Sequence, residues 1–110
     1  MDEFARKRRE GNRLMTACDE FFGDFGRLDD IVYADGAIPK KYKELTGLSI
    51  SVATRCEECI AYHIQGCVAE KASKQEIVEA IKIGVIGGGS ITYPSARFAF
   101  SLLIEVGIIE

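Results

Sequence analysis

The chain has 110 residues, of which 47% are hydrophobic and 28% are charged, a balance that argues against disorder and predicts a single domain over 1–110. Its formal net charge is −3, and the only basic cluster runs from Arg6 to Arg9. A protein that binds nucleic acid usually presents a clear basic face, so we expect no nucleic-acid partner.

We expect neither a targeting segment nor a membrane-spanning segment. The cluster leads into Glu10, Gly11 and Asn12 rather than an apolar run, so we read no secretory signal. The longest apolar stretch, 83–91, is broken by glycines and is too short to span a bilayer. We therefore expect a cytoplasmic protein with no membrane partner, in which a close cysteine pair cycles or binds metal rather than serving as a permanent crosslink.

The N-terminal third predicts two helical segments. Apolar residues recur with helical spacing over 4–22 and again over 24–34. Asp35-Gly36 indicates a turn, and Pro39 fits the first turn of the helix that follows. These two segments have three possible roles, namely to complete the core, to pack between subunits or to cover the site, and the sequence leaves all three open.

Two further helices are predicted in the middle of the chain. The first covers 40–53, although 49–52 alternates briefly as a strand would. Thr54 is expected to cap the second, which runs over 56–71. The second helix carries one continuous stripe with the three- and four-residue spacing of a buried helical face. The stripe contains Cys56, Cys59, Ile60, His63, Ile64, Cys67 and Val68.

The C-terminal part predicts two more helices. Ser73 and Glu76 form a capping box, and Gly87-Gly88-Gly89 ends the helix that starts there. Gly84 within that helix is expected to permit close packing, and a last helix should start near 90–94. The glycine run matches neither dinucleotide-binding nor Walker patterns, so we expect no nucleotide cofactor. The prediction is an all-α bundle of about six helices without a sheet.

The candidate chemistry lies on the second of the middle helices. Cys56, Cys59 and His63 stand at positions i, i+3 and i+7, which share one face of a helix. Cys56 falls at the expected helix N-terminus, where free amides and the helix dipole favour a thiolate. Two thiols at this spacing can close a disulfide, with one attacking and the other resolving the mixed intermediate. This set therefore indicates thiol redox chemistry.

A zinc site is the main structural alternative. Cys56, Cys59 and His63 would supply three ligands and another residue the fourth. Cys67 cannot join them on a continuous helix, because 11 residues at about 1.5 Å each place it about 16 Å from Cys56. We interpret Cys67, and likewise Cys18 on the first helix, as small buried hydrophobic residues.

The middle of the chain resembles a known family. Glu44-Leu45 followed by 51–63 matches the pattern E-x11-C-x-x-C-x-x-x-H, and is similar to the carboxymuconolactone decarboxylase and alkylhydroperoxidase D (AhpD-like) family over roughly 40–100. The resemblance implies an all-helical fold that assembles as a trimer or hexamer. It also implies a redox branch in which Cys56 and Cys59 cycle between dithiol and disulfide. Lactone decarboxylases of the family generally lack this cysteine pair.

Carried onto this chain, the resemblance implies a proton relay with Glu44 as the acid and His63 as the base. Glu44 can reach the cysteine face only if its helix packs antiparallel to the helix that carries His63. The substrate would be a peroxide or a disulfide, and an external dithiol or protein would be the reductant, with no cofactor and no metal. A third reading keeps the acid–base pair for decarboxylation or hydrolysis and leaves the cysteines as bystanders.

The identity of the attacking cysteine rests on two opposed arguments. The helix terminus favours Cys56, because its thiolate would be stabilised there. The single turn between Cys59 and His63 favours Cys59, because an imidazole would lie near that thiol. We predict that Cys59 attacks and Cys56 resolves.

Overall fold

The computed structural model describes residues 2–110. No strand occurs within that range, and the predicted all-α fold is confirmed. The brief alternation at 49–52 lies inside a helix, because tertiary packing outweighs so short a pattern. The elements are α1 (Asp2–Cys18), α2 (Glu20–Tyr33), α3 (Lys40–Ala53), α4 (Glu57–Ala69), α5 (Lys74–Gly88), the 3₁₀ helix η1 (Ser90–Thr92) and α6 (Tyr93–Glu105).

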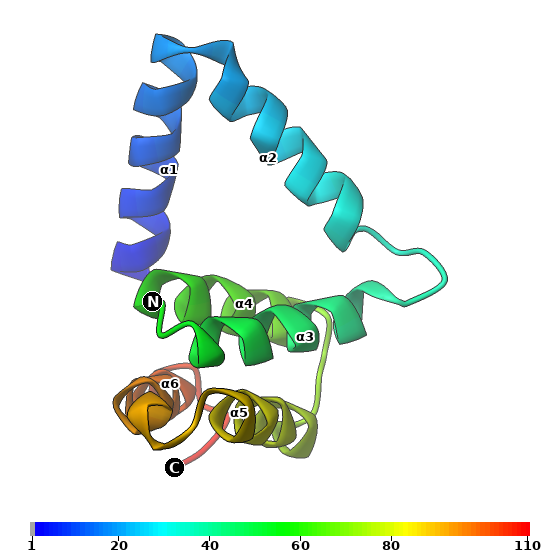
Figure 1. The fold of residues 1–110 in the computed structure, drawn as a ribbon, viewed down its shortest axis with the longest axis vertical. Helices are drawn as coiled ribbons and strands as arrows, with labels where there is room; N and C mark the ends of the chain where they lie inside the picture. The colour runs from blue at the N-terminus through cyan, green and yellow to red at the C-terminus, as the bar shows by residue number, and fades with distance from the viewer. Residues whose placement is uncertain (1) are drawn as a thin grey trace.

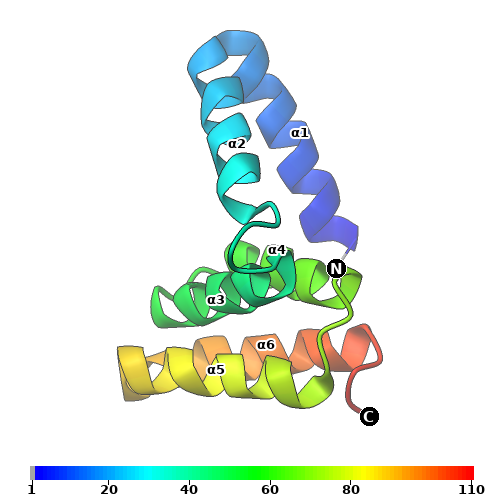
Figure 2. The same cartoon turned by 90° about the vertical axis from the view of Figure 1, so that its right-hand side faces the viewer.

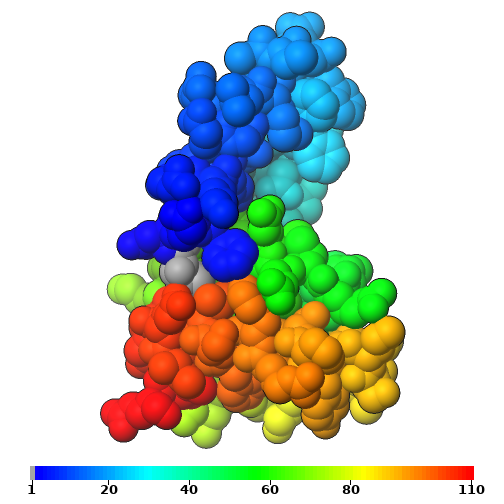
Figure 3. All heavy atoms as spheres, turned by 90° about the vertical axis from the view of Figure 1, so that its left-hand side faces the viewer, coloured from blue at the N-terminus to red at the C-terminus, as the bar shows by residue number. Residues whose placement is uncertain are grey.

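The helices form a two-layer body and a projecting hairpin. Helices α3 and α4 make one layer and α5 and α6 the other, while α1 and α2 lean away from the body (Figures 1 and 2). The space-filling view shows the hairpin as an arm above the body (Figure 3). The core lies in the body and contains Leu45, Leu48, Val52, Ile60, Ala61, Ile64, Cys67, Ala72, Ile77, Ala80, Ile81, Ala99, Leu102 and Leu103.

The hairpin contributes little to that core. Helix α2 has no buried residue, and α1 buries Ala5 and packs Phe4 against the core. Large apolar side chains of α2 remain exposed, for example Phe25 at 63% and Ile31 at 69%. Of the three roles left open for these segments, completing the core is therefore excluded for α2. Within residues 2–110, no helix is both long and apolar enough to cross a membrane.

The break between α1 and α2 differs from the prediction. Apolar spacing predicted one helix over 4–22, but α1 ends at Cys18 and α2 begins at Glu20. Asp19 separates them, since its carboxylate accepts a hydrogen bond of 2.9 Å from the Phe21 amide as an N-cap. Aspartate is among the preferred N-cap residues, and a cap overrides an apolar periodicity that runs through it.

The later helix boundaries agree with the sequence except at Thr54. The Ser73 hydroxyl accepts from the Glu76 amide at 3.1 Å and the Glu76 carboxylate accepts from the Ser73 amide at 2.8 Å, so the capping box is confirmed. Thr54, predicted to cap α4, instead ends α3, and its hydroxyl donates to the Ile50 carbonyl at 2.8 Å. Cys56 takes the N-cap position of α4.

Gly84 sets how closely α5 approaches α3. A Cβ added there would lie 2.6 Å from the Ser49 carbonyl oxygen and 2.8 Å from the Val52 Cβ. Both contacts are shorter than packed carbon atoms tolerate. The predicted close packing at Gly84 is therefore confirmed, and the two layers can meet only because this side chain is absent.

We expect Gly84→Ala to lower the free energy of unfolding by about 1–3 kcal/mol, because the helices must separate to admit the methyl group. The matched control is Gly87→Ala on the same helix, where an added Cβ meets nothing within 4 Å. That control is expected to raise stability by up to about 1 kcal/mol, since alanine restricts the unfolded chain more than glycine does. Urea unfolding followed by circular dichroism measures both. Equal stability of the two variants would contradict this account of the layer contact.

Candidate active site

The two cysteines of the motif lie at the start of α4. Cys56 is the N-cap, and its sulfur accepts a hydrogen bond of 3.2 Å from the Cys59 amide. The two residues are joined by a disulfide, with their Cα atoms 5.2 Å apart. Cys59 is exposed and Cys56 is half-buried. The predicted closure of the pair across one helical turn is thus compatible with the folded backbone.

A tight connection reverses the chain just before this pair. Arg55 adopts the left-handed conformation with φ 58°, which costs a non-glycine residue about 1 kcal/mol. The Cys56 amide then donates to the Ser51 carbonyl at 3.0 Å. Since Ser51 lies opposite Cys56 near the turn and Glu44 lies opposite His63 farther along, α3 and α4 are antiparallel. This is the arrangement that the relay required.

Glu44 and His63 form a buried pair between these two helices. Their side chains are 4% and 11% exposed, and the Glu44 Oε1 lies 2.9 Å from the His63 Nδ1. The other carboxylate oxygen, Oε2, accepts from the Lys40 Nζ at 2.9 Å. An ionised carboxylate can only accept, so the Nδ1 of His63 carries the proton in this bond. That tautomer leaves Nε2 as the free basic nitrogen of the ring.

Two glycines make room for the pair in a reciprocal way. A Cβ on Gly47 of α3 would lie 2.5–2.7 Å from three atoms of the His63 ring. A Cβ on Gly66 of α4 would overlap the Glu44 carboxylate. Each helix therefore presents one side chain of the pair and, three residues later, a gap for the other helix's side chain. Neither glycine was predicted to belong to the site, although their shared offset of three from Glu44 and His63 was a usable signal.

Two tyrosine rings enclose the imidazole. The Tyr33 ring, from the end of α2, lies 5.1 Å from the His63 ring at an interplanar angle of 33°, and the Tyr62 ring lies 5.1 Å away at 69°. Burial raises the pKa of Tyr33 and of Tyr62 above the usual tyrosine value, so both rings stay uncharged at neutral pH. The hairpin thus does cover part of the site, through Tyr33.

The two remaining cysteines, Cys67 and Cys18, differ in their exposure to solvent. Cys67 is fully buried, and burial, with smaller contributions from the charges of Glu44 and Glu76, raises the pKa of its thiol to about 12. Its interpretation as a small buried residue is confirmed. The same interpretation is wrong for Cys18, which is an exposed free thiol. It ends α1 at the tip of the hairpin, away from the core.

The zinc alternative gains no support from the arrangement. No three His, Cys, Asp or Glu side chains among residues 2–110 are placed to hold a metal ion together. Cys56 and Cys59 are already bonded to each other, and His63 turns its Nδ1 to Glu44. A zinc site would require the Cys56–Cys59 disulfide to be reduced first, whereas His63 could bind through Nε2 while its Nδ1 stays on Glu44.

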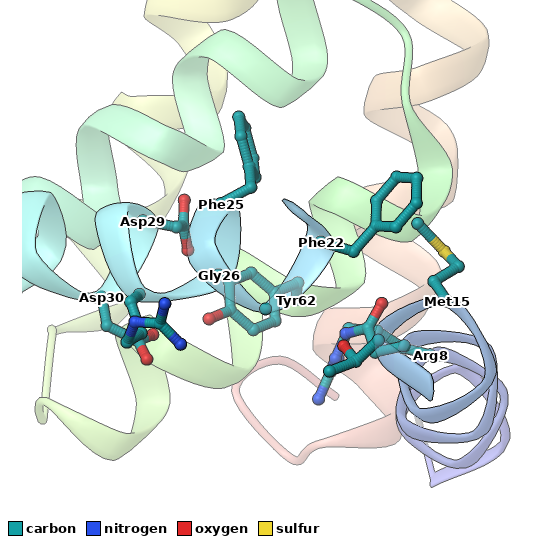
Figure 4. Close-up of a pocket in the computed structure, with 12 residues that line it drawn as sticks. Arg8, Met15, Phe22, Phe25, Gly26, Asp29, Asp30 and Tyr62 are labelled. Atoms are coloured by element: carbon teal, nitrogen blue, oxygen red, sulfur yellow. The ribbon is translucent and has the colours of Figure 1, made fainter. Parts of the chain in front are cut away.

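A cavity of about 710 Å³ is lined by residues of α1 and α2 and by Tyr62 of α4. Figure 4 shows the Tyr62 ring among side chains of the hairpin, including Arg8, Met15 and Phe22. The Arg8 guanidinium stands 4.7 Å from the centre of the Tyr62 ring. Neither cysteine of the disulfide lines this cavity, so it borders the site only through Tyr62.

A family model and several known proteins are similar to this chain. Residues 19–103 match the model of the carboxymuconolactone decarboxylase family. A curated relative from Paracoccus denitrificans, named uncharacterized protein 4 in cox locus, is 33% identical over 82 residues, which are 74% of each chain.

Solved structures of the same family are similar over nearly the whole chain. A Thermotoga maritima family protein, described with a suggested role in antioxidative response, is 41% identical at a TM-score of 0.90, covering 96% of this chain and 90% of that one. A Legionella pneumophila family protein is 28% identical at a TM-score of 0.82, covering 96% and 97%.

The contrast between Cys67 and Cys18 predicts selective alkylation. With a pKa of about 12, about one Cys67 thiol in ten thousand is ionised at pH 8, and only the thiolate reacts. After reduction, iodoacetamide at pH 8 is expected to modify Cys18, Cys56 and Cys59 in the folded protein, and Cys67 only in urea. Peptide mass spectrometry reads each site. Modification of Cys67 in the folded protein at the rate of Cys18 would contradict its enclosure.

Proposed function

The chain belongs to the carboxymuconolactone decarboxylase family, and from this premise we propose that it is a thiol-dependent oxidoreductase, an alkylhydroperoxidase or disulfide reductase. The observation that carries the proposal is the Cys56–Cys59 disulfide on the first turn of α4, one turn before the buried His63–Glu44 pair. A reactive thiol, a resolving thiol and an oriented base are the parts that this chemistry needs.

In the peroxidase reaction, His63 accepts the Cys59 proton and the resulting thiolate attacks the terminal oxygen of a hydroperoxide. The O–O bond breaks, the alcohol leaves with the proton that His63 returns, and Cys59 becomes a sulfenic acid. The Cys56 thiol then attacks that sulfur, forming the disulfide and releasing water. The peroxide is reduced by two electrons, and the dithiol is oxidised by two.

A disulfide substrate follows the same order. The Cys59 thiolate attacks one sulfur of the substrate, and the other leaves as a thiol after taking a proton. Cys56 resolves the mixed disulfide and releases the second substrate thiol. In both reactions an external dithiol or a reductant protein must restore the pair, and the exposure of Cys59 leaves that sulfur open to it.

Two further properties belong to the proposal. The suggested role of the Thermotoga maritima family protein in antioxidative response favours a peroxide or disulfide substrate, and we propose that this chain meets it in the reducing cytoplasm. We also propose that the chain works as a homo-oligomer, a trimer or hexamer. The exposed apolar side chains of α2, such as Phe21 and Leu28, offer surface for subunit contacts.

The first test is the fate of the cysteines with one equivalent of oxidant. The reduced protein is treated with cumene hydroperoxide in one sample and with oxidised lipoamide in another. At least one of these oxidants is expected to convert Cys56 and Cys59 to their intramolecular disulfide. With the peroxide, Cys56→Ser should accumulate a sulfenic acid on Cys59, which dimedone traps for mass spectrometry. Trapping on Cys56 in the Cys59→Ser variant instead would exchange the two roles. Free thiols after both oxidants would sink the proposal.

The second test addresses the relay. Glu44→Gln and His63→Gln are each expected to slow disulfide formation by about 10²–10⁴-fold, the usual contribution of general acid–base catalysis. Circular dichroism must show intact helices, and Glu58→Gln, an exposed carboxylate beside Cys59, is the matched control with an unchanged rate. Turnover of a lactone by the double variant Cys56→Ser/Cys59→Ser would instead favour the decarboxylase reading.

A further inference from the structure

Lys40 is a partly exposed residue that contacts Glu44 of the buried Glu44–His63 pair. Its Nζ lies 2.9 Å from the Glu44 Oε2 and 3.4 Å from the Tyr33 carbonyl oxygen. The Lys40 side chain is 36% exposed, whereas the Glu44 side chain is 4% exposed. The lysine therefore bridges solvent, the end of α2 and the carboxylate that holds His63.

No other cation among residues 2–110 makes an ion pair with Glu44. Tyr33 of α2, and Tyr62 and Cys67 of α4, face the pair in uncharged form, because burial raises the pKa of each. The other charged groups that act on this cluster are Asp29 and Asp30 of α2, Arg8 of α1, Glu70 after α4 and Glu76 of α5.

The charge of the buried cluster follows from these contacts. Lys40 and an ionised Glu44 cancel, so a neutral His63 completes a cluster with no net charge. Without the lysine, an ionised Glu44 beside a neutral His63 would leave one uncompensated negative charge in a desolvated site, which is unfavourable. The Glu44–His63 pair would then take up a proton more readily, and a protonated pair cannot accept one from a thiol.

We propose that Lys40 is a positioning residue of this site, which keeps Glu44 ionised and His63 uncharged so that the imidazole can act as a base at neutral pH. The inference rests on the proposed thiol oxidoreductase function for its kinetic consequence, but its electrostatic part does not. The hydrogen bond to Glu44 raises the pKa of Lys40 above the usual lysine value. The lysine therefore stays cationic across the whole range in which a thiol peroxidase is assayed.

The variants that isolate this role are Lys40→Met and Lys40→Arg, with Lys43→Met as the matched control. Lys43 lies on the same helix and also binds the end of α2, donating 2.7 Å bonds to the Val32 and Ala34 carbonyl oxygens. Glu44 is not among the partners of those bonds. Loss of the tie to α2 is therefore common to Lys40→Met and Lys43→Met, while loss of the charge beside Glu44 is particular to Lys40→Met.

The kinetic readout is the pH dependence of disulfide formation with the oxidant that wild type accepts. In Lys40→Met, the acid limb of the profile is expected to move to higher pH by on the order of one pH unit, with the plateau rate at high pH retained. Lys40→Arg should restore most of the wild-type profile, because the charge is kept, and Lys43→Met should leave the profile in place.

A second readout needs no turnover. The sequence contains one histidine, so in tag-free oxidised protein the imidazole signals in an NMR titration belong to His63 alone. The midpoint of that titration is expected at higher pH in Lys40→Met than in wild type and Lys43→Met. A coincident midpoint in all three would overturn the role of Lys40. Failure of wild type to react with any oxidant, together with a shifted midpoint, would overturn the proposed function and leave the electrostatic role standing.

Discussion

The Glu44–His63 hydrogen bond across α3 and α4 is the constraint on which the site depends. A buried carboxylate costs several kcal/mol unless its oxygens are paired, and here one oxygen binds His63 and the other binds Lys40. The bond forms only if the two helices come close, which the missing side chains of Gly47 and Gly66 allow. The spacing of α3 and α4 and the geometry of the Glu44–His63 pair therefore impose the same requirement, which two glycines on opposite helices meet.

The same helix pair fixes the cysteines. The chain reverses through Arg55, and this turn makes Cys56 the N-cap of α4 just where the antiparallel register aligns Glu44 with His63. The spacing of the motif thus has a geometric meaning. The eleven residues between Glu44 and Cys56 run down α3 and around the turn, and the next seven return to His63. Inserting one residue in either stretch would rotate the acid or the base off the shared face.

The sequence predicted the parts that depend on local rules. The capping box at Ser73 and the close packing at Gly84 follow from hydrogen-bond chemistry and side-chain size, and both are confirmed. The buried stripe on α4 follows from periodicity and is confirmed at Ile60, His63, Ile64 and Cys67, whereas Cys59 and Val68 are exposed. The pairing of Glu44 with His63 is tertiary, and only family resemblance suggested it. The helix break at Asp19 was missed because an N-cap interrupts an apolar periodicity that continues through it. Cys18 was misread for a different reason. Apolar spacing looks the same whether a helical face meets the core or, as in the hairpin, stands away from it.

The hairpin of α1 and α2 stands away from the core but contacts the candidate site at the end of α2. Helix α2 buries none of its residues, yet its last residue, Tyr33, stacks on the His63 ring. Its C-terminal carbonyls accept hydrogen bonds from Lys40 and Lys43 of α3, as the negative end of a helix dipole favours. Because Lys40 binds both the Tyr33 carbonyl and the Glu44 carboxylate, the end of α2 and the buried pair share one cation. Helix α2 is therefore tied to the Glu44–His63 pair at its C-terminal end, although none of its own residues is buried.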